Sequence, residues 1–201
     1  MPLGGAELYL VAAKLNGQLR VFIVEAGTQG LGWLDDPAMG LKAAQTGTLV
    51  LDQVQLPPSA LLGDTDFDYQ AFIDLGVLHW CAMAVGCCQA VLGYVVPYVN
   101  AREAFGEPVS HRQGVAFMVA NMGIELESMR LLLWRAASLV EQGLDFHKEA
   151  FLARHLCAER AIEIGTNGVQ LLGGHGYVKE HPVERWYRDL RAMAIIHGLH
   201  L

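Results

Sequence analysis

The chain has 201 residues, 53% of them hydrophobic, and a formal net charge of −7 at pH 7. This length can bury one or two cores, and the acidic balance argues against nucleic acid or an anionic membrane surface as a partner. Its four cysteines lack C-x-x-C spacing, and no charged segment precedes an early apolar core, so we expect buried free thiols in a cytoplasmic protein without a secretory signal.

The first third of the chain has the alternation of β-strands. Residues 7–25 have a strand-like pattern, in which Leu19, Val21 and Ile23 alternate, and Asn16-Gly17 between two apolar runs is typical of a hairpin turn. Residues 47–56 predict another strand, which Pro57-Pro58 closes. We therefore expect a small antiparallel β-region here.

Helical spacing begins after Phe67. Apolar residues recur at helical intervals in four stretches, 69–104, 112–142, 146–172 and 183–196. The breaks between them are short, and Asp145 is placed to cap the third helix. Short links between long amphipathic helices favour antiparallel neighbours, so these stretches predict an up-down four-helix bundle.

One segment of the first helix, residues 77–99, is long enough to span a bilayer and holds no Asp, Glu, Lys or Arg. His79, Gln89 and Pro97 interrupt it, and the neighbouring amphipathic helices need an apolar partner. A buried bundle helix is therefore favoured over a membrane span.

The most informative motifs are QLLGGHGY at 170–177 and PVERWYRD at 182–189. Two adjacent glycines at a helix end permit positive φ and let a backbone or a cofactor approach closely. A simple helix cap followed by a proline-started helix would also explain them. The two motifs resemble the closing signature of acyl-CoA dehydrogenases, in which a Q-x-x-G-G-x-G-Y turn precedes a helix that opens with P-V-E-R.

Two further segments resemble the same family in the same order. Residues 98–122 are similar to its R-x-x-F-G stretch with the following Q and A-x-M, and residues 47–63 are similar to the last strands of its middle domain. The resemblance implies a mainly α fold, with residues 1–63 as the second half of the middle β-domain and residues 64–201 as the C-terminal helical bundle. It also implies that the chain is a fragment or that a partner supplies an N-terminal half.

The resemblance implies FAD as cofactor. The flavin-contacting positions of the family fall here on Arg102 for phosphate, on Phe105 and Gln113 for the adenine side, and on Gln170, Gly173 and Gly174 for the pyrophosphate and ribitol side. A solvated surface charge is the alternative for Arg102. The glycine turn follows a helix and lacks G-x-G-x-x-G spacing, so a Rossmann motif is rejected.

Catalysis is where the sequence departs from the family pattern. The family's glutamate base would fall on His197, an alternative position of that base falls on Gly76, and a substrate-positioning arginine falls on Val77. Asp74 is retained and, with Gly198, is expected to contact substrate. A neutral imidazole can accept a proton near neutral pH, but His197 could equally be a space-filling residue of an inactive relative. As a metal pair, His197 and His200 lack a third ligand at a suitable spacing, and no metal site is predicted.

Two functions therefore remain open beside the disfavoured third, a membrane-helix protein built around residues 77–99. The first is an FAD-dependent oxidoreductase that desaturates an acyl-CoA thioester at its α,β bond. The second is a non-catalytic subunit that completes a partner's flavin site. Either would form a homo- or hetero-oligomer, which in the family is a dimer of dimers, and the sequence does not specify the acyl chain length or the electron acceptor.

Overall fold

The computed structural model describes residues 6–63 and 66–198, with side chains of the last helix described only as far as Ile195. The chain divides into two compact units, Met1–Ile73 and Asp74–Leu201.

The first unit contains two antiparallel strand pairs. Strands β1 (Leu8–Leu15) and β2 (Gln18–Glu25) form the predicted hairpin, and its turn residues Asn16 and Gly17 have positive φ of 51° and 82°. Strand β3 (Leu31–Asp35), which we did not predict, pairs with β4 (Gly47–Leu51). The strand expected over 47–56 ends at Leu51, because Gln53 takes a left-handed φ of 50° that breaks the extended chain.

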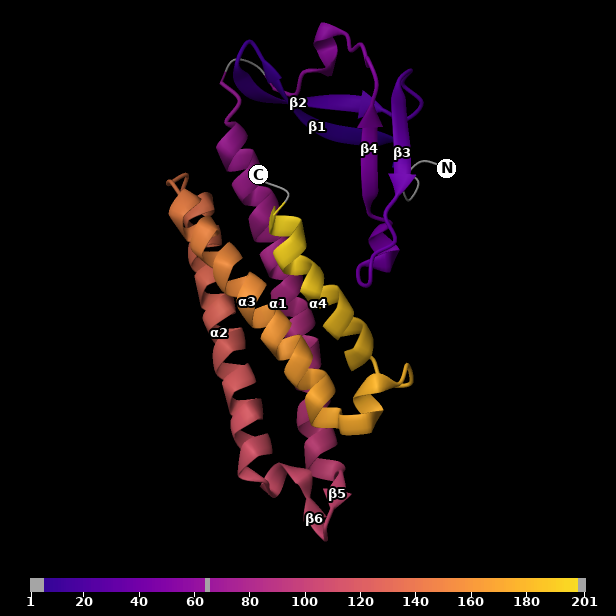
Figure 1. Cartoon of the computed structure of the whole chain (residues 1–201). Coiled ribbons are helices and arrows are strands. Elements are labelled where there is room, and N and C mark those ends of the chain that lie inside the picture. Colours follow the sequence, from indigo (N-terminus) through magenta and orange to yellow (C-terminus); the bar gives the residue numbers. More distant parts are fainter. Residues whose placement is uncertain (1–5, 64–65, 199–201) are drawn as a thin grey trace. The chain divides into compact units, whose positions relative to one another are not determined.

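The second unit is the predicted up-down helical bundle, as Figure 1 shows. Its helices are α1 (Tyr69–Ala101), α2 (Gln113–Glu141), α3 (His147–Leu172) and α4 (Val183–Gly198). The mainly α fold class and the four-helix arrangement are confirmed. Each helix lies within three residues of its expected bounds, because apolar periodicity is strong in long amphipathic helices.

The bundle core follows a four-three spacing of buried residues. On α1 they are Val77, Cys81, Ala84, Cys88, Val91 and Val95, and on α2 they are Met122, Leu126, Met129, Leu133 and Ala136. This spacing keeps one seam of each helix turned toward its neighbours. Gly168 of α3 makes close packing possible, because a Cβ there would lie 2.6 Å from Cγ1 of Val91 on α1.

The buried cysteines are free thiols in this core. Cys81, Cys88 and Cys157 are fully buried and Cys87 is partly buried. The Cys81 and Cys157 side chains are hydrogen-bonded, and this contact together with burial raises the pKa of the Cys81 thiol. Burial also raises the pKa of Cys87, to about 11. Helix α1 is long and apolar enough to cross a membrane by length and composition, and here its buried face belongs to the bundle core.

The connections position the ends of the helices. Strands β5 (Glu103–Ala104) and β6 (Glu107–Pro108) form a short hairpin between α1 and α2, where only a break was predicted. Helix α2 ends at Glu141, and Gly143 follows it in a Schellman motif, in which the Leu144 N–H donates to the Leu139 carbonyl at 3.0 Å. Asp145 accepts the His147 N–H at 3.1 Å, but Phe146 occupies the cap position of α3, so Asp145 lies one residue earlier than expected.

Candidate functional site

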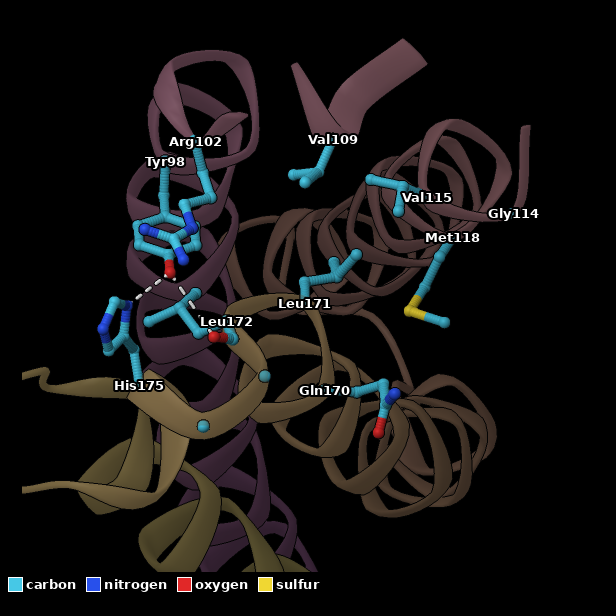
Figure 2. A pocket seen from close by; sticks show the side chains of 12 residues that line it. Tyr98, Arg102, Val109, Gly114, Val115, Met118, Gln170, Leu171, Leu172 and His175 are labelled. Atoms are coloured by element: carbon cyan, nitrogen blue, oxygen red, sulfur yellow. Dashed lines mark hydrogen bonds between the residues drawn. The ribbon is translucent and has the colours of Figure 1, made fainter. Parts of the chain in front are cut away.

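A cavity of about 460 Å³ lies in the helical bundle (Figure 2). The end of α1, the start of α2, the end of α3 and the short 3₁₀ helix η5 (Gly173–Tyr177) form its wall. The residues that line it include Tyr98, Arg102, Val115, Met118, Gln170, Gly173, Gly174 and His175. Four residues predicted to bind flavin therefore line one cavity.

Arg102 supplies the positive charge of this wall. It follows α1 directly, its N–H donates to the Tyr98 carbonyl at 2.8 Å, and its own carbonyl accepts the Val109 N–H at 2.8 Å. These bonds fix its backbone, whereas its guanidinium has no ion pair or hydrogen bond within the residues that the structure describes. A fixed arginine with an unused guanidinium is suited to a phosphate group.

The glycine turn supplies backbone at the opposite side of the opening. Gly173 ends α3 with a positive φ of 59°, which favours glycine. A Cβ added to Gly173 or Gly174 would meet no atom within 4 Å, so these residues border open space. Gly176 differs, because a Cβ there would collide with the Val169 carbonyl oxygen. The first two glycines thus leave room for a ligand, and the third packs against α3.

Two tyrosines of α1 hold the turn in place. The Tyr98 hydroxyl lies 2.7 Å from Nδ1 of His175 and donates to the Leu172 carbonyl at 3.4 Å, and Figure 2 shows these bonds. One turn earlier, the Tyr94 hydroxyl lies 2.8 Å from Nδ1 of His181. The two histidine rings stack with centroids 5.2 Å apart. Sequence reasoning missed this cluster, since helical periodicity carries no signal for side chains paired across 77 residues.

Phe105 and Gln113 lie outside the set of residues that line the cavity. Phe105 is at the tip of the β5–β6 hairpin with its side chain 97% exposed, and the Arg112 guanidinium carbon lies 5.8 Å from its ring centroid. Gln113 is the first residue of α2, directly before Gly114, which does line the cavity. Their assignment to the adenine side stays a prediction.

Asp74 forms a separate polar contact. Its carboxylate is buried, and Oδ2 lies 2.8 Å from Nδ1 of His147, the first residue of α3. This pair joins the first and third helices. Its role toward substrate stays a prediction, and His147 was not predicted.

The proposed base lies at the edge of the structure. His197 and Gly198 are in the last turn of α4, but their side chains are outside the described residues, as is the whole of His200. Gly76, at the alternative base position, is an exposed residue of α1. Among the described residues, no group of three or more His, Cys, Asp or Glu side chains could hold a metal ion.

Comparison with known proteins identifies the family. The family model "Acyl-CoA dehydrogenase, C-terminal domain" matches residues 69–200. The mitochondrial short-chain specific acyl-CoA dehydrogenase of Rattus norvegicus is 36% identical over 191 residues, which are 92% of this chain and 46% of that protein.

Solved structures agree with this match. Butyryl-CoA dehydrogenase from Megasphaera elsdenii superimposes with a TM-score of 0.85 at 30% identity, covering 98% of this chain and 55% of that one. A chain of the ChsE4-ChsE5 complex from Mycobacterium tuberculosis gives a TM-score of 0.88 at 26% identity, with 96% and 52% covered. The chain spans about half the length of the curated relatives it matches. The resemblance found in its motifs is confirmed, and the chain belongs to the acyl-CoA dehydrogenase family.

Proposed function

We propose that this chain forms the C-terminal half of an FAD-dependent oxidoreductase of the acyl-CoA dehydrogenase type, which desaturates an acyl-CoA thioester at its α,β bond. The observation that supports this function is the cavity lined by Arg102, Gln170 and the Gly173–Gly174 backbone. Its residues meet the needs of a flavin dinucleotide: the pyrophosphate requires a cation or N–H donors, and the glycines let it approach the backbone. FAD, when bound, supplies the acceptor for the substrate's β-hydride.

Loss of the Arg102 charge tests this function. Because the chain spans about half of its relatives, the experiment uses a complex with the N-terminal half of the Megasphaera elsdenii relative, produced together in one cell. Arg102→Gln should lower the fraction of FAD retained through gel filtration, and Arg102→Lys should restore part of it. Arg185→Gln is the matched control, because Arg185 is exposed and does not line the cavity. Equal flavin retention in all variants would contradict the proposed site. The chain produced without the N-terminal half should purify without the yellow colour of bound flavin.

His197 is the proposed base for the α-proton. It stands at the position of the family's catalytic glutamate, and a neutral imidazole accepts a proton when the pH exceeds its pKa. In the flavin-containing complex, His197→Ala should abolish bleaching of the flavin by acyl-CoA under anaerobic conditions while flavin binding persists. Equal bleaching by wild type and His197→Ala would exclude this role.

The second candidate function is a non-catalytic subunit that completes a partner's flavin site. The observation that favours it is the lack of a carboxylate at both base positions, which hold His197 and Gly76. In that case the wild-type complex should bind flavin without any bleaching by a panel of acyl-CoA thioesters, and His197→Glu should introduce bleaching.

Both candidate functions imply that the protein forms an oligomer in the cytoplasm. Helix α2 exposes Phe117, Ile124 and Leu131 at seven-residue intervals, followed by Trp134, each at least 60% exposed. Such an apolar stripe is typical of an interface, and the free cysteines suit a reducing compartment. Light scattering should show an oligomer, or aggregates when the N-terminal half is missing; a monodisperse monomer would contradict the interface.

A further inference from the structure

Asp74 is the one charged residue that is buried in the described part of the chain. Its side chain is only 9% exposed. A carboxylate that is removed from water keeps its charge only where hydrogen-bond donors surround it. Helix α1, which carries Asp74, contains no Lys or Arg. A positively charged side chain of the same helix therefore cannot compensate this carboxylate.

His147 supplies a donor from the start of α3. Its Nδ1 lies 2.8 Å from Oδ2 of Asp74, and because a carboxylate only accepts hydrogen bonds, the ring N–H donates to it. The backbone N–H of His147 donates to Oδ1 of Asp145 at 3.1 Å, which fixes the residue from its other side. The buried carboxylate of α1 is thus held by a side chain of α3.

The family motif explains why a donor from another helix is needed. The substrate-positioning arginine of the family falls on Val77, three residues after Asp74. Residues at this spacing lie on the same helix face, and both are buried here. An arginine at position 77 would therefore lie beside the Asp74 carboxylate, where Val77 offers no donor. His147 contributes a donor to that carboxylate from α3.

The pair lies at the end of the bundle toward which α4 runs. A Cβ added to Gly168 of α3 would lie 3.9 Å from Val183, and one added to Gly165 would lie 3.2 Å from Leu190. Residue numbers thus rise along α4 as they fall along α3, and Figure 1 shows α4 running back along the bundle. The last turn of α4, which contains His197, therefore points toward the end where α1 and α3 begin.

We propose that His147 is a positioning residue for acyl-CoA binding, whose imidazole holds the Asp74 carboxylate in the orientation that contacts the substrate. It takes the place of the arginine that Val77 has replaced. This inference rests on the proposed function, in which Asp74 contacts substrate, and adds to it a residue that acts through Asp74. The step involves hydrogen bonds only, and no covalent bond changes.

Equilibrium binding to the complex with the N-terminal half of the relative tests the inference. The probe is S-butyl-coenzyme A, a thioether that has no acidic α-proton and cannot be desaturated. In calorimetry, His147→Ala should weaken its binding about tenfold, the size of one hydrogen bond to a charged group. FAD retention should not change, because the flavin cavity at Tyr98 lies roughly 36 Å further along α1 at about 1.5 Å per residue.

The conservative variant and the control separate the donor from the bulk of the side chain. His147→Asn should restore most of the affinity, because its amide nitrogen can donate from near the position of Nδ1. His147→Leu keeps bulk without a donor and repeats the test if His147→Ala does not fold. His155→Ala is the matched control, since His155 is an exposed histidine of α3 whose ring contacts Phe151.

A double-mutant cycle shows whether His147 acts through Asp74. Asp74→Asn should weaken binding of the thioether at least as much as His147→Ala. The double variant should bind no more weakly than Asp74→Asn alone, because the imidazole then has no carboxylate to position. With butyryl-CoA, His147→Ala should raise the concentration needed for half-maximal flavin bleaching and leave the maximal rate unchanged. A merely structural role would give neither result.

The outcomes separate this inference from the proposed function. Unchanged affinity in His147→Ala, or additive losses in the double variant, would overturn the role of His147 and leave the flavin function standing. Thioether binding that depends on His147, in a complex that butyryl-CoA does not bleach, would uphold His147 and contradict the catalytic function. A wild-type complex that does not bind the thioether would overturn both.

Discussion

The two units of this chain differ in how they bury apolar surface. In the described part of the first unit, the buried hydrophobic residues are Val21, Val24 and Ala60, and Leu8, Leu10 and Leu34 are each more than half exposed. In the bundle, all four helices contribute to one buried core. Two-stranded sheets are marginal in water, whereas four packed helices supply their own hydrophobic stabilisation. The comparison indicates that the bundle is the unit that holds its fold alone.

Paired leucine substitutions are the strongest test of this difference. Leu126 of α2 is 1% exposed and Leu10 of β1 is 57% exposed. Leu126→Ala should lower the free energy of unfolding by about 2–5 kcal/mol, whereas Leu10→Ala should change it by about 0.5 kcal/mol or less. Chemical denaturation followed by circular dichroism measures both. A comparable loss in the two variants would mean that the strand surface is covered in solution.

Paired glycine substitutions sharpen the comparison inside the bundle. Gly176→Ala forces a Cβ against the Val169 carbonyl, so we expect a loss of about 1–3 kcal/mol and a displaced turn. Gly174→Ala enters open space and should leave stability unchanged while it reduces ligand affinity. Thermal unfolding measures the loss of stability, and FAD titration measures the loss of affinity. Equal melting temperatures of Gly176→Ala and Gly174→Ala would show that the glycine turn accommodates the added Cβ at Gly176 without cost.

The rate at which a reagent modifies the cysteine thiols measures how often the helical bundle opens. All four cysteines belong to the bundle, and burial raises the pKa of Cys88 and of Cys87, so little reactive thiolate forms near neutral pH. A disulfide reagent should modify the native chain slowly and should count four thiols after denaturation. Rapid modification of the native chain would contradict a closed core.

A surface pair of α4 should give the smallest effect. Arg188 donates to Glu184 at 2.9 Å and holds the pKa of that carboxyl below its usual range. The folded-state pKa is lowered, so the pair stabilises the fold above the unfolded pKa of about 4.3 and loses that effect as the pH falls. Glu184→Gln should therefore lower stability by less than about 1 kcal/mol at neutral pH, with no difference in acid. If Glu184→Gln were still less stable than the wild type in acid, the loss would come from altered packing of the side chain and not from the ion pair.

Prediction from the sequence was more accurate for the helical bundle than for the strands of the first unit. Helix bounds were predictable because the buried positions of α1 and α2 repeat at four-three spacing. Strand β3 was missed, since Leu31–Asp35 is short and lacks a clear alternation. Arg102, Gln170 and the glycines could be placed through family motifs. The Tyr98–His175 and Asp74–His147 pairs could not, because they depend on how distant helices pack.

The contacts of Tyr94 and Tyr98 also bear on the order of folding. They join residues 87 and 77 positions apart, whereas the turn between α2 and α3 joins close neighbours. Closing a long loop costs more entropy than closing a short one, and distant contacts form later. The α2–α3 hairpin can therefore form early, while the wall that carries His175 is completed only when the last third of the chain reaches α1. A chain still emerging from the ribosome would lack this cavity until its final helices are made.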